Sequence, residues 1–131
     1  MSEASFPVRL EGGIPVIAAP EEIDITTAGL LRTTLLAAGA DGRRTLVVDM
    51  SGTHFCDSAG LNVLVRAHLR AEAGGCEVRL VMSGTDVLRI FVVTGIDRLI
   101  PIFASLGEAL GDAPACVPVP RAGLAAGLAA G

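Results

Sequence analysis

The chain of 131 residues has no tryptophan, no tyrosine and no lysine, so all ten of its basic residues are arginine. Only four phenylalanines could stack on bases, and the net charge is −4 with no basic run, which argues against nucleic-acid binding. No apolar run reaches the roughly 18–20 residues of a membrane span. The first residues also lack the basic and apolar regions of a secretory signal. These absences predict a cytoplasmic protein that binds neither nucleic acid nor a membrane.

Cysteine is scarce as well. Cys56, Cys76 and Cys116 show neither a CxxC motif nor the spacing of a zinc site, and three is an odd number. We expect free thiols in a reducing compartment, with Cys56 as a small buried residue at a strand end. No metal site and no cofactor are expected.

What the chain has in abundance is apolar sequence, with 51% hydrophobic residues, enough for one domain with a real core. Segments 8–10 and 14–18 flank Gly12-Gly13 and predict a β-hairpin. Pro15 cannot donate a backbone hydrogen bond, which indicates an edge position near the start of the second strand. Residues 20–24 are predicted to form a loop.

The remaining pattern alternates between helices and strands. Thr26 or Thr27 is expected to cap a helix that ends near Ala38. Further strands are predicted at 45–49, 77–82 and 99–103, and further helices at 58–73, 87–93 and 105–110. This order predicts an α/β domain over residues 7–111, in which a hairpin precedes alternating units of a mixed, mostly parallel sheet packed with helices. Residues 112–131, rich in Pro, Ala and Gly, are expected to be a flexible tail.

The most informative stretch is residues 57–61, Asp-Ser-Ala-Gly-Leu, which lies between an apolar strand and an amphipathic helix. Ser58 therefore stands at a helix N-terminus, where free N–H groups and the helix dipole favour negative charge such as a phosphate. A simpler interpretation is that Asp57 or Ser58 only caps the helix, which is worth about 1 kcal/mol. Residue physics alone favours the cap.

The helix that follows has two expected faces. The buried stripe comprises Leu61, Leu64, Val65, His68 and Leu69. Ser58, Asn62 and Arg66 recur every four residues on a polar face. Gly60 costs the helix about 1 kcal/mol relative to Ala, which indicates that another backbone or an active site comes close to it.

A serine between a strand and a helix also suggests a hydrolase nucleophile. That motif is Gly-x-Ser-x-Gly, and this chain has Cys56 at the first position. Of the two histidines, His54 is too near Ser58 in sequence, and His68 belongs to the buried stripe as a core residue. We therefore do not expect an enzyme.

Segment 46–61 as a whole resembles the signature of STAS domains, specifically those of bacterial anti-sigma-factor antagonists. The shared features are an apolar strand, a short loop with Asp and Ser, an apolar pair, and then Asp-Ser-x-Gly-Leu. The resemblance extends over about residues 7–111 and includes Glu22-Ile23-Asp24, which is similar to the Glu-Leu-Asp loop of the family.

The resemblance implies partner switching. An unphosphorylated antagonist binds an anti-sigma factor that is also a GHKL-type serine kinase, so that sigma factor is released. Phosphorylation of the serine, here Ser58, separates the complex, and a metal-dependent serine phosphatase resets it. The residues implied to contact the partner are Asp24, Thr26, Asp57, Gly60, Asn62 and Arg66.

Three alternatives stay open at this point. Asp24 is as suited to capping the first helix as to touching a partner. Thr53 resembles an additional phosphorylation position of some relatives, yet loop hydroxyls more often form turns. The third alternative concerns the whole protein, which could be a STAS scaffold or transport-accessory subunit in which Ser58 is never phosphorylated.

Overall fold

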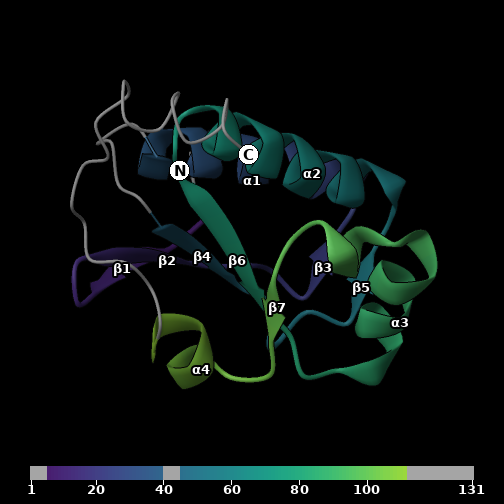
Figure 1. Ribbon diagram of the computed structural model, residues 1–131. Helices are drawn as coiled ribbons and strands as arrows, with labels where there is room; N and C mark the ends of the chain where they lie inside the picture. Colours follow the sequence, from purple (N-terminus) through teal and green to yellow (C-terminus); the bar gives the residue numbers. More distant parts are fainter. Residues whose placement is uncertain (1–5, 40–44, 112–131) are drawn as a thin grey trace, which may run out of the picture.

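A computed structural model describes residues 6–39 and 45–111 of the chain (Figure 1). Its strands are β1 (Val8–Glu11), β2 (Ile14–Ala18), β3 (Glu22–Ile23), β4 (Thr45–Asp49), β5 (Phe55–Cys56), β6 (Glu77–Val81) and β7 (Ile102–Phe103). Its helices are α1 (Ile25–Gly39), α2 (Ser58–Ala73), α3 (Thr85–Thr94) and α4 (Leu106–Gly111), with a 3₁₀ turn, η1, at Ile96–Arg98. No helix within these ranges combines the length and apolar content needed to cross a bilayer.

Five strands form one mixed sheet in the order β1-β2-β4-β6-β7. The β1–β2 hairpin is antiparallel, and the other three pairings are parallel. Gly12 and Gly13 make the hairpin turn with φ of 60° and 85°, a conformation that two-residue hairpin turns need and that glycine adopts readily. The strands β3 and β5 pair separately, parallel to each other, as a second sheet of two strands. The predicted α/β fold with a mixed, mostly parallel sheet is confirmed.

Both faces of the large sheet are covered by helices. In Figure 1, α1 and α2 lie together over one face and α4 lies under the other. The strand β4 shows why its sequence has no polar alternation: Leu46 and Val48 join the core beneath α1 and α2, whereas Val47 packs in the core beneath α4. A central parallel strand is apolar on both faces because neither face meets water.

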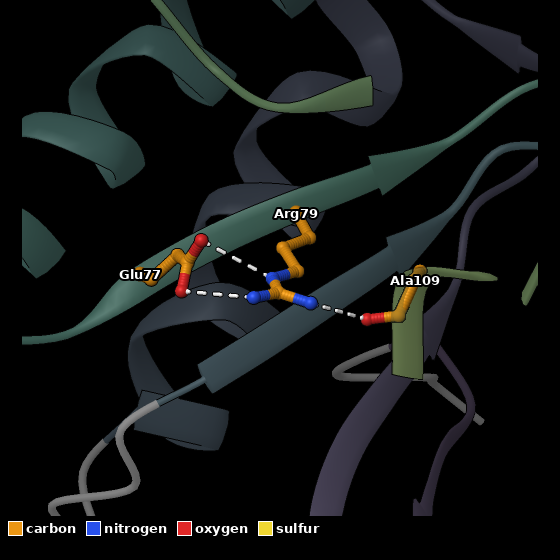
Figure 2. A network of polar contacts seen from close by, with 3 residues as sticks. All are labelled: Glu77, Arg79 and Ala109. Carbon is orange, nitrogen blue, oxygen red and sulfur yellow. Dashed lines mark hydrogen bonds and ion pairs between the residues drawn. The ribbon is translucent and has the colours of Figure 1, made fainter. Parts of the chain in front are cut away.

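Arg79 anchors α4 to the sheet (Figure 2). The guanidinium is buried, and its Nε and a terminal nitrogen donate to the carboxylate of Glu77 at 3.1 and 3.4 Å. The other terminal nitrogen donates to the carbonyl oxygen of Ala109 in α4 at 2.8 Å. The guanidinium also lies 5.3 Å from the ring centre of Phe103. Planar fork geometry lets arginine satisfy these partners at once.

Replacing Arg79 with Ala is expected to lower the free energy of unfolding by about 2–3 kcal/mol, because the buried carbonyl of Ala109 loses its donor. Urea denaturation followed by circular dichroism measures this loss. Arg89→Ala on the exposed face of α3 is the matched control and is expected to stay within about 0.5 kcal/mol of the parent. Equal stability of the two variants would contradict the anchoring role.

Several predicted elements differ from the observed ones. The segment 20–24 is not simply a loop, because Glu22–Ile23 forms strand β3. The last predicted strand, 99–103, shrinks to Ile102–Phe103 after η1. The edge position predicted from Pro15 is wrong, since β2 lies between β1 and β4. Pro15 is tolerated because the parallel ladder to β4 begins one residue later, at Val16.

The predicted helix at 58–73 is confirmed with both of its bounds. Within it, Leu69 is wrong as a core residue, since it is 50% exposed, and Ala67 is buried instead. His68 is buried as predicted but not satisfied, because neither ring nitrogen has a hydrogen bond within the described residues. The predicted flexible tail at 112–131, with Cys116, lies outside the described residues and stays a prediction.

Candidate functional site

The two-stranded sheet of β3 and β5 brings two helix starts together. Glu22 pairs with Phe55 and Ile23 with Cys56, and the chain then leaves each strand directly into a helix, α1 or α2. The N–H of Asp57 donates to the carbonyl of Ile23 at 3.0 Å, extending this pairing to the residue before Ser58. The segments around Asp24 and Ser58 are thus fixed side by side at the carboxyl end of the large sheet, where α/β proteins commonly place their functional loops.

Asp57, and not Ser58, caps α2. Asp57 has an extended backbone, and its Oδ1 accepts a hydrogen bond from the N–H of Gly60 at 3.0 Å. Ser58 is the first residue of the helix; its side chain is exposed and makes no hydrogen bond within residues 6–39 and 45–111. The capping role that the sequence left open between the two residues belongs to the aspartate. The hydroxyl of Ser58 is left with no structural task in the described part of the chain.

Gly60 is buried because the first turn of α2 packs tightly on the β3–β5 pair. A Cβ atom at this position would lie 2.5 Å from Cγ2 of Ile23 and 2.8 Å from Sγ of Cys56. Both neighbours are themselves buried and cannot give way. The close approach predicted from Gly60 therefore occurs inside the fold, between side chains, and Gly60 offers no surface of its own to a partner.

Asp24 begins α1 in the same way that Asp57 begins α2. Its Oδ1 accepts from the N–H of Thr26 at 2.9 Å, from the Thr26 hydroxyl at 2.6 Å and from the N–H of Thr27 at 3.2 Å. The Thr27 hydroxyl accepts in return from the N–H of Asp24, a reciprocal cap. Neither threonine is the N-cap that the sequence analysis expected. The Thr26 hydroxyl lowers the pKa of Asp24, so this carboxylate is charged at neutral pH.

Thr53 is a buried structural residue. Its side chain is 2% exposed, and its hydroxyl donates to the carbonyl of Pro20 at 2.7 Å, which ties the loop before β5 to the loop before β3. The turn-forming interpretation of Thr53 accounts for this geometry, and an accessible phosphate acceptor does not. Cys56 is buried as expected, and burial, together with the charge of Asp57, raises the pKa of its thiol to about 12.

The comparisons with known proteins identify the family. A family model for the STAS domain matches residues 5–109. The chain belongs to the STAS domain family. The resemblance noted in segment 46–61 is thereby confirmed over nearly the whole of the predicted domain.

Named relatives of this STAS domain are similar to it over most of their length. The anti-sigma-F factor antagonist RsfB of Mycobacterium tuberculosis is 31% identical over 100 residues, which cover 75% of this chain and 80% of that protein. The crystal structure of an anti-sigma factor antagonist from Mycobacterium paratuberculosis superposes with a TM-score of 0.75 at 29% identity, covering 82% of this chain and 91% of the other. An anti-sigma-factor antagonist (STAS) domain protein from Planctomyces limnophilus gives 0.71 at 28% identity, covering 83% and 97%.

The surface around Ser58 in this STAS domain is part polar and part apolar. Asn62 and Arg66 follow Ser58 along the exposed face of α2, with the Arg66 Nε 3.4 Å from the Asn62 Oδ1. Sequence reasoning missed the two apolar side chains that flank the helix starts: Ile25 is 77% exposed and Phe55 is 44% exposed. An apolar residue directly after the Asp24 cap, and another two residues before the Asp57 cap, were the signals that could have revealed them.

The described residues contain no group of three or more His, Cys, Asp or Glu placed to hold a metal ion. His54 is exposed, and its Nε2 lies 3.9 Å from the carboxylate of Glu21, not in a hydrogen bond to Ser58. The geometry thus offers a hydroxyl free of hydrogen bonds in the described residues, on a segment paired with that of Asp24, together with a mixed surface suited to protein contact.

Because Asp57 caps α2 and Ser58 does not, substitutions at the two positions are predicted to change stability by unequal amounts. Asp57→Ala is expected to lower the free energy of unfolding by about 1 kcal/mol, because the N–H of Gly60 loses its acceptor. Ser58→Ala is expected to change it by less than about 0.5 kcal/mol. Thermal and urea denaturation of the two variants measure this. A larger loss for Ser58→Ala than for Asp57→Ala would show that the serine is the working cap.

Two glycine-to-alanine changes test the packing at the site. Gly60→Ala is expected to destabilise the protein by about 2 kcal/mol, since the added methyl group meets Ile23 and Cys56. Gly29→Ala is the matched control, because nothing lies within 4 Å of the added Cβ in α1, and it is expected to stabilise by about 0.5–1 kcal/mol. Urea midpoints that move in the same direction for both variants would refute this account.

Proposed function

We propose that this protein is an anti-sigma-factor antagonist of bacterial type that changes partners when Ser58 is phosphorylated. The names of its relatives support the general role, and the exposed, unbonded hydroxyl of Ser58 beside a separate capping residue is the observation that carries the switch. The proposed partners are an anti-sigma factor that is also a GHKL-type serine kinase, and a metal-dependent serine phosphatase. The protein acts by binding, without catalysis of its own, in the cytoplasm.

The proposed switch follows from local electrostatics. A phosphate on Ser58 adds roughly −1.5 to −2 charges at neutral pH. Within the protein, this charge lies at the N-terminus of α2, where the helix dipole favours it, and the phosphate displaces no hydrogen bond of the described fold. The domain is therefore expected to stay folded after modification.

The partner surface is affected in the opposite way. The proposed contact face comprises Ser58 together with Asp24, Thr26, Asp57, Asn62 and Arg66, so it contains two carboxylates and one arginine. A partner that accommodates these carboxylates and a neutral hydroxyl would meet a third, stronger anion and would have to desolvate it. A loss of about 3 kcal/mol already weakens binding more than 100-fold.

The switch is tested with candidate GHKL kinases from the same genome. Ser58→Ala is expected to bind the cognate kinase in the presence of ATP without release, and Ser58→Glu to bind at least tenfold more weakly, as measured by calorimetry. Intact mass after incubation with ATP is expected to rise by one phosphate in the parent and not in Ser58→Ala.

Ser83→Glu provides the matched control, because Ser83 is also an exposed serine and lies before α3. It is expected to bind like the parent protein. Equal affinity of the parent, Ser58→Ala and Ser58→Glu for the kinase would contradict the switch. It would instead favour a STAS scaffold or transport-accessory role.

A further inference from the structure

A second surface feature lies between the two helices that cover the sheet. A shallow groove, with a cavity volume of about 10 Å³, is lined by Arg32 and Leu35 of α1 and by Val63, Arg66, Ala67 and Arg70 of α2. Leu35 and Ala67 are buried and Val63 is half-buried, so the floor is apolar, whereas the three arginines are exposed. The groove therefore combines an apolar base with a rim of positive charge.

The three rim arginines have no ion-pair partner in the part of the chain that the structure describes. Arg66 reaches only the amide oxygen of Asn62, which carries no charge. Other arginines do find carboxylates: Arg9 lies 2.6 Å from Glu11, and Arg79 lies 3.1 Å from Glu77. A protein with a net charge of −4 thus leaves three like charges unneutralised around one groove.

This arrangement selects an anion of a particular kind. Guanidinium groups bind carboxylates and phosphates through paired hydrogen bonds, so the three arginines favour an anion that lies across the groove. The lining has no aromatic ring on which a base could stack, and the groove has a cavity volume of only about 10 Å³, far below the roughly 300–1,000 Å³ of pockets that enclose whole small molecules. A groove this shallow suits carboxylates on the surface of a partner protein better than it suits a nucleotide.

We propose that this arginine groove binds an acidic segment of the partner protein, with Asp or Glu side chains held between Arg32 of α1 and Arg66 and Arg70 of α2. The inference rests on the proposed function, since it assigns the segment to the partner that covers Ser58. Ser58, Asn62, Arg66 and Arg70 are spaced four residues apart along α2, and each step turns about 40° around the helix, so this polar row winds from Ser58 toward the groove. Eight residues of helix separate Ser58 from Arg66 by about 12 Å, well within the width of one protein interface.

The groove is tested without the partner, using a hexaglutamate peptide as the probe. Titration into the full-length ¹⁵N-labelled protein at low salt is expected to shift amide resonances of α1 and α2 around Arg32, Arg66 and Arg70, saturably and less at high salt. Arg32→Gln and Arg70→Gln are each expected to weaken the dissociation constant about two- to fivefold, and the triple variant with Arg66→Gln more than tenfold. Arg89→Gln, an equal change of charge on α3, is the control and is expected to leave binding unchanged.

The other outcomes each overturn the inference. Absence of shifts in the groove, or equal weakening by Arg89→Gln, would show that there is no specific site. Displacement of the peptide by inorganic phosphate at equal concentration would show that the ligand is a free anion. Groove shifts that depend on protein concentration alone would identify a second copy of this chain as the occupant.

The same titration separates this inference from the proposed function. Ser58→Glu is expected to bind hexaglutamate like the parent, because the added charge lies beyond the rim of the groove. If hexaglutamate binds normally but kinase affinity is the same for the parent, Ser58→Ala and Ser58→Glu, the groove inference stands and only the switch is refuted. A kinase that responds to Ser58 but binds the triple arginine variant as tightly as the parent would refute only the groove as its docking surface.

Discussion

The site depends on the close contact between the first turn of α2 and the short parallel pair β3–β5. Gly60 has no side chain, so Ile23 and Cys56 can fill the space where a Cβ would lie, 2.5 and 2.8 Å away. This contact sets the height at which α2 starts above the small sheet, and the pairing of Ile23 with Cys56 sets its register against the start of α1. The β3–β5 pairing holds two helix starts, more than thirty residues apart in sequence, on one surface. Each strand has only two residues and would not be stable without the other.

Within that surface, structural and signalling tasks fall on adjacent residues. Asp57 and Asp24 satisfy the free N–H groups of their helices, and Thr53 ties the two preceding loops together through Pro20. The polar groups of these three side chains are therefore occupied by hydrogen bonds within the fold. Ser58 lies among them without such a task, so its hydroxyl can be changed chemically at little cost to stability.

The sequence predicted best what depends on local pattern. The bounds of α2 follow from Asp57 before it and Gly74-Gly75 after it, and the two-faced burial of β4 follows from its unbroken apolar run.

The features that could not be predicted from the sequence depend mostly on contacts between residues that are distant in sequence. A strand of two residues, such as Glu22–Ile23, has no period to detect, and its partner Phe55–Cys56 lies more than thirty residues away. The sequence also left open which residue caps α2, because Asp57 and Ser58 are neighbours and either side chain could accept the bond. In the structure the N–H of Gly60 donates to Asp57. The buried face of α2 comprises Gly60, Leu64, Ala67 and His68, so Leu69 falls outside it, and the small Ala67 carries too little apolar signal to mark its side of the helix.

The polar face of α2 is electrically divided, and this division bears on how a phosphate at Ser58 could act. The N-terminal end carries Ser58 next to Asp57 and beside the segment of Asp24, and the groove farther along carries three arginines without ion pairs in the described residues. The Debye length at physiological ionic strength is about 8 Å, whereas Ser58 and Arg66 are about 12 Å apart along the helix. A phosphate on Ser58 would therefore be largely screened from the groove and would not neutralise it internally. In the proposed mechanism the groove keeps its attraction for an acidic segment in both states, and the phosphate acts on the part of the partner that lies over the helix start. Attraction at one end would speed re-association after dephosphorylation, and repulsion at the other end would determine when the complex separates.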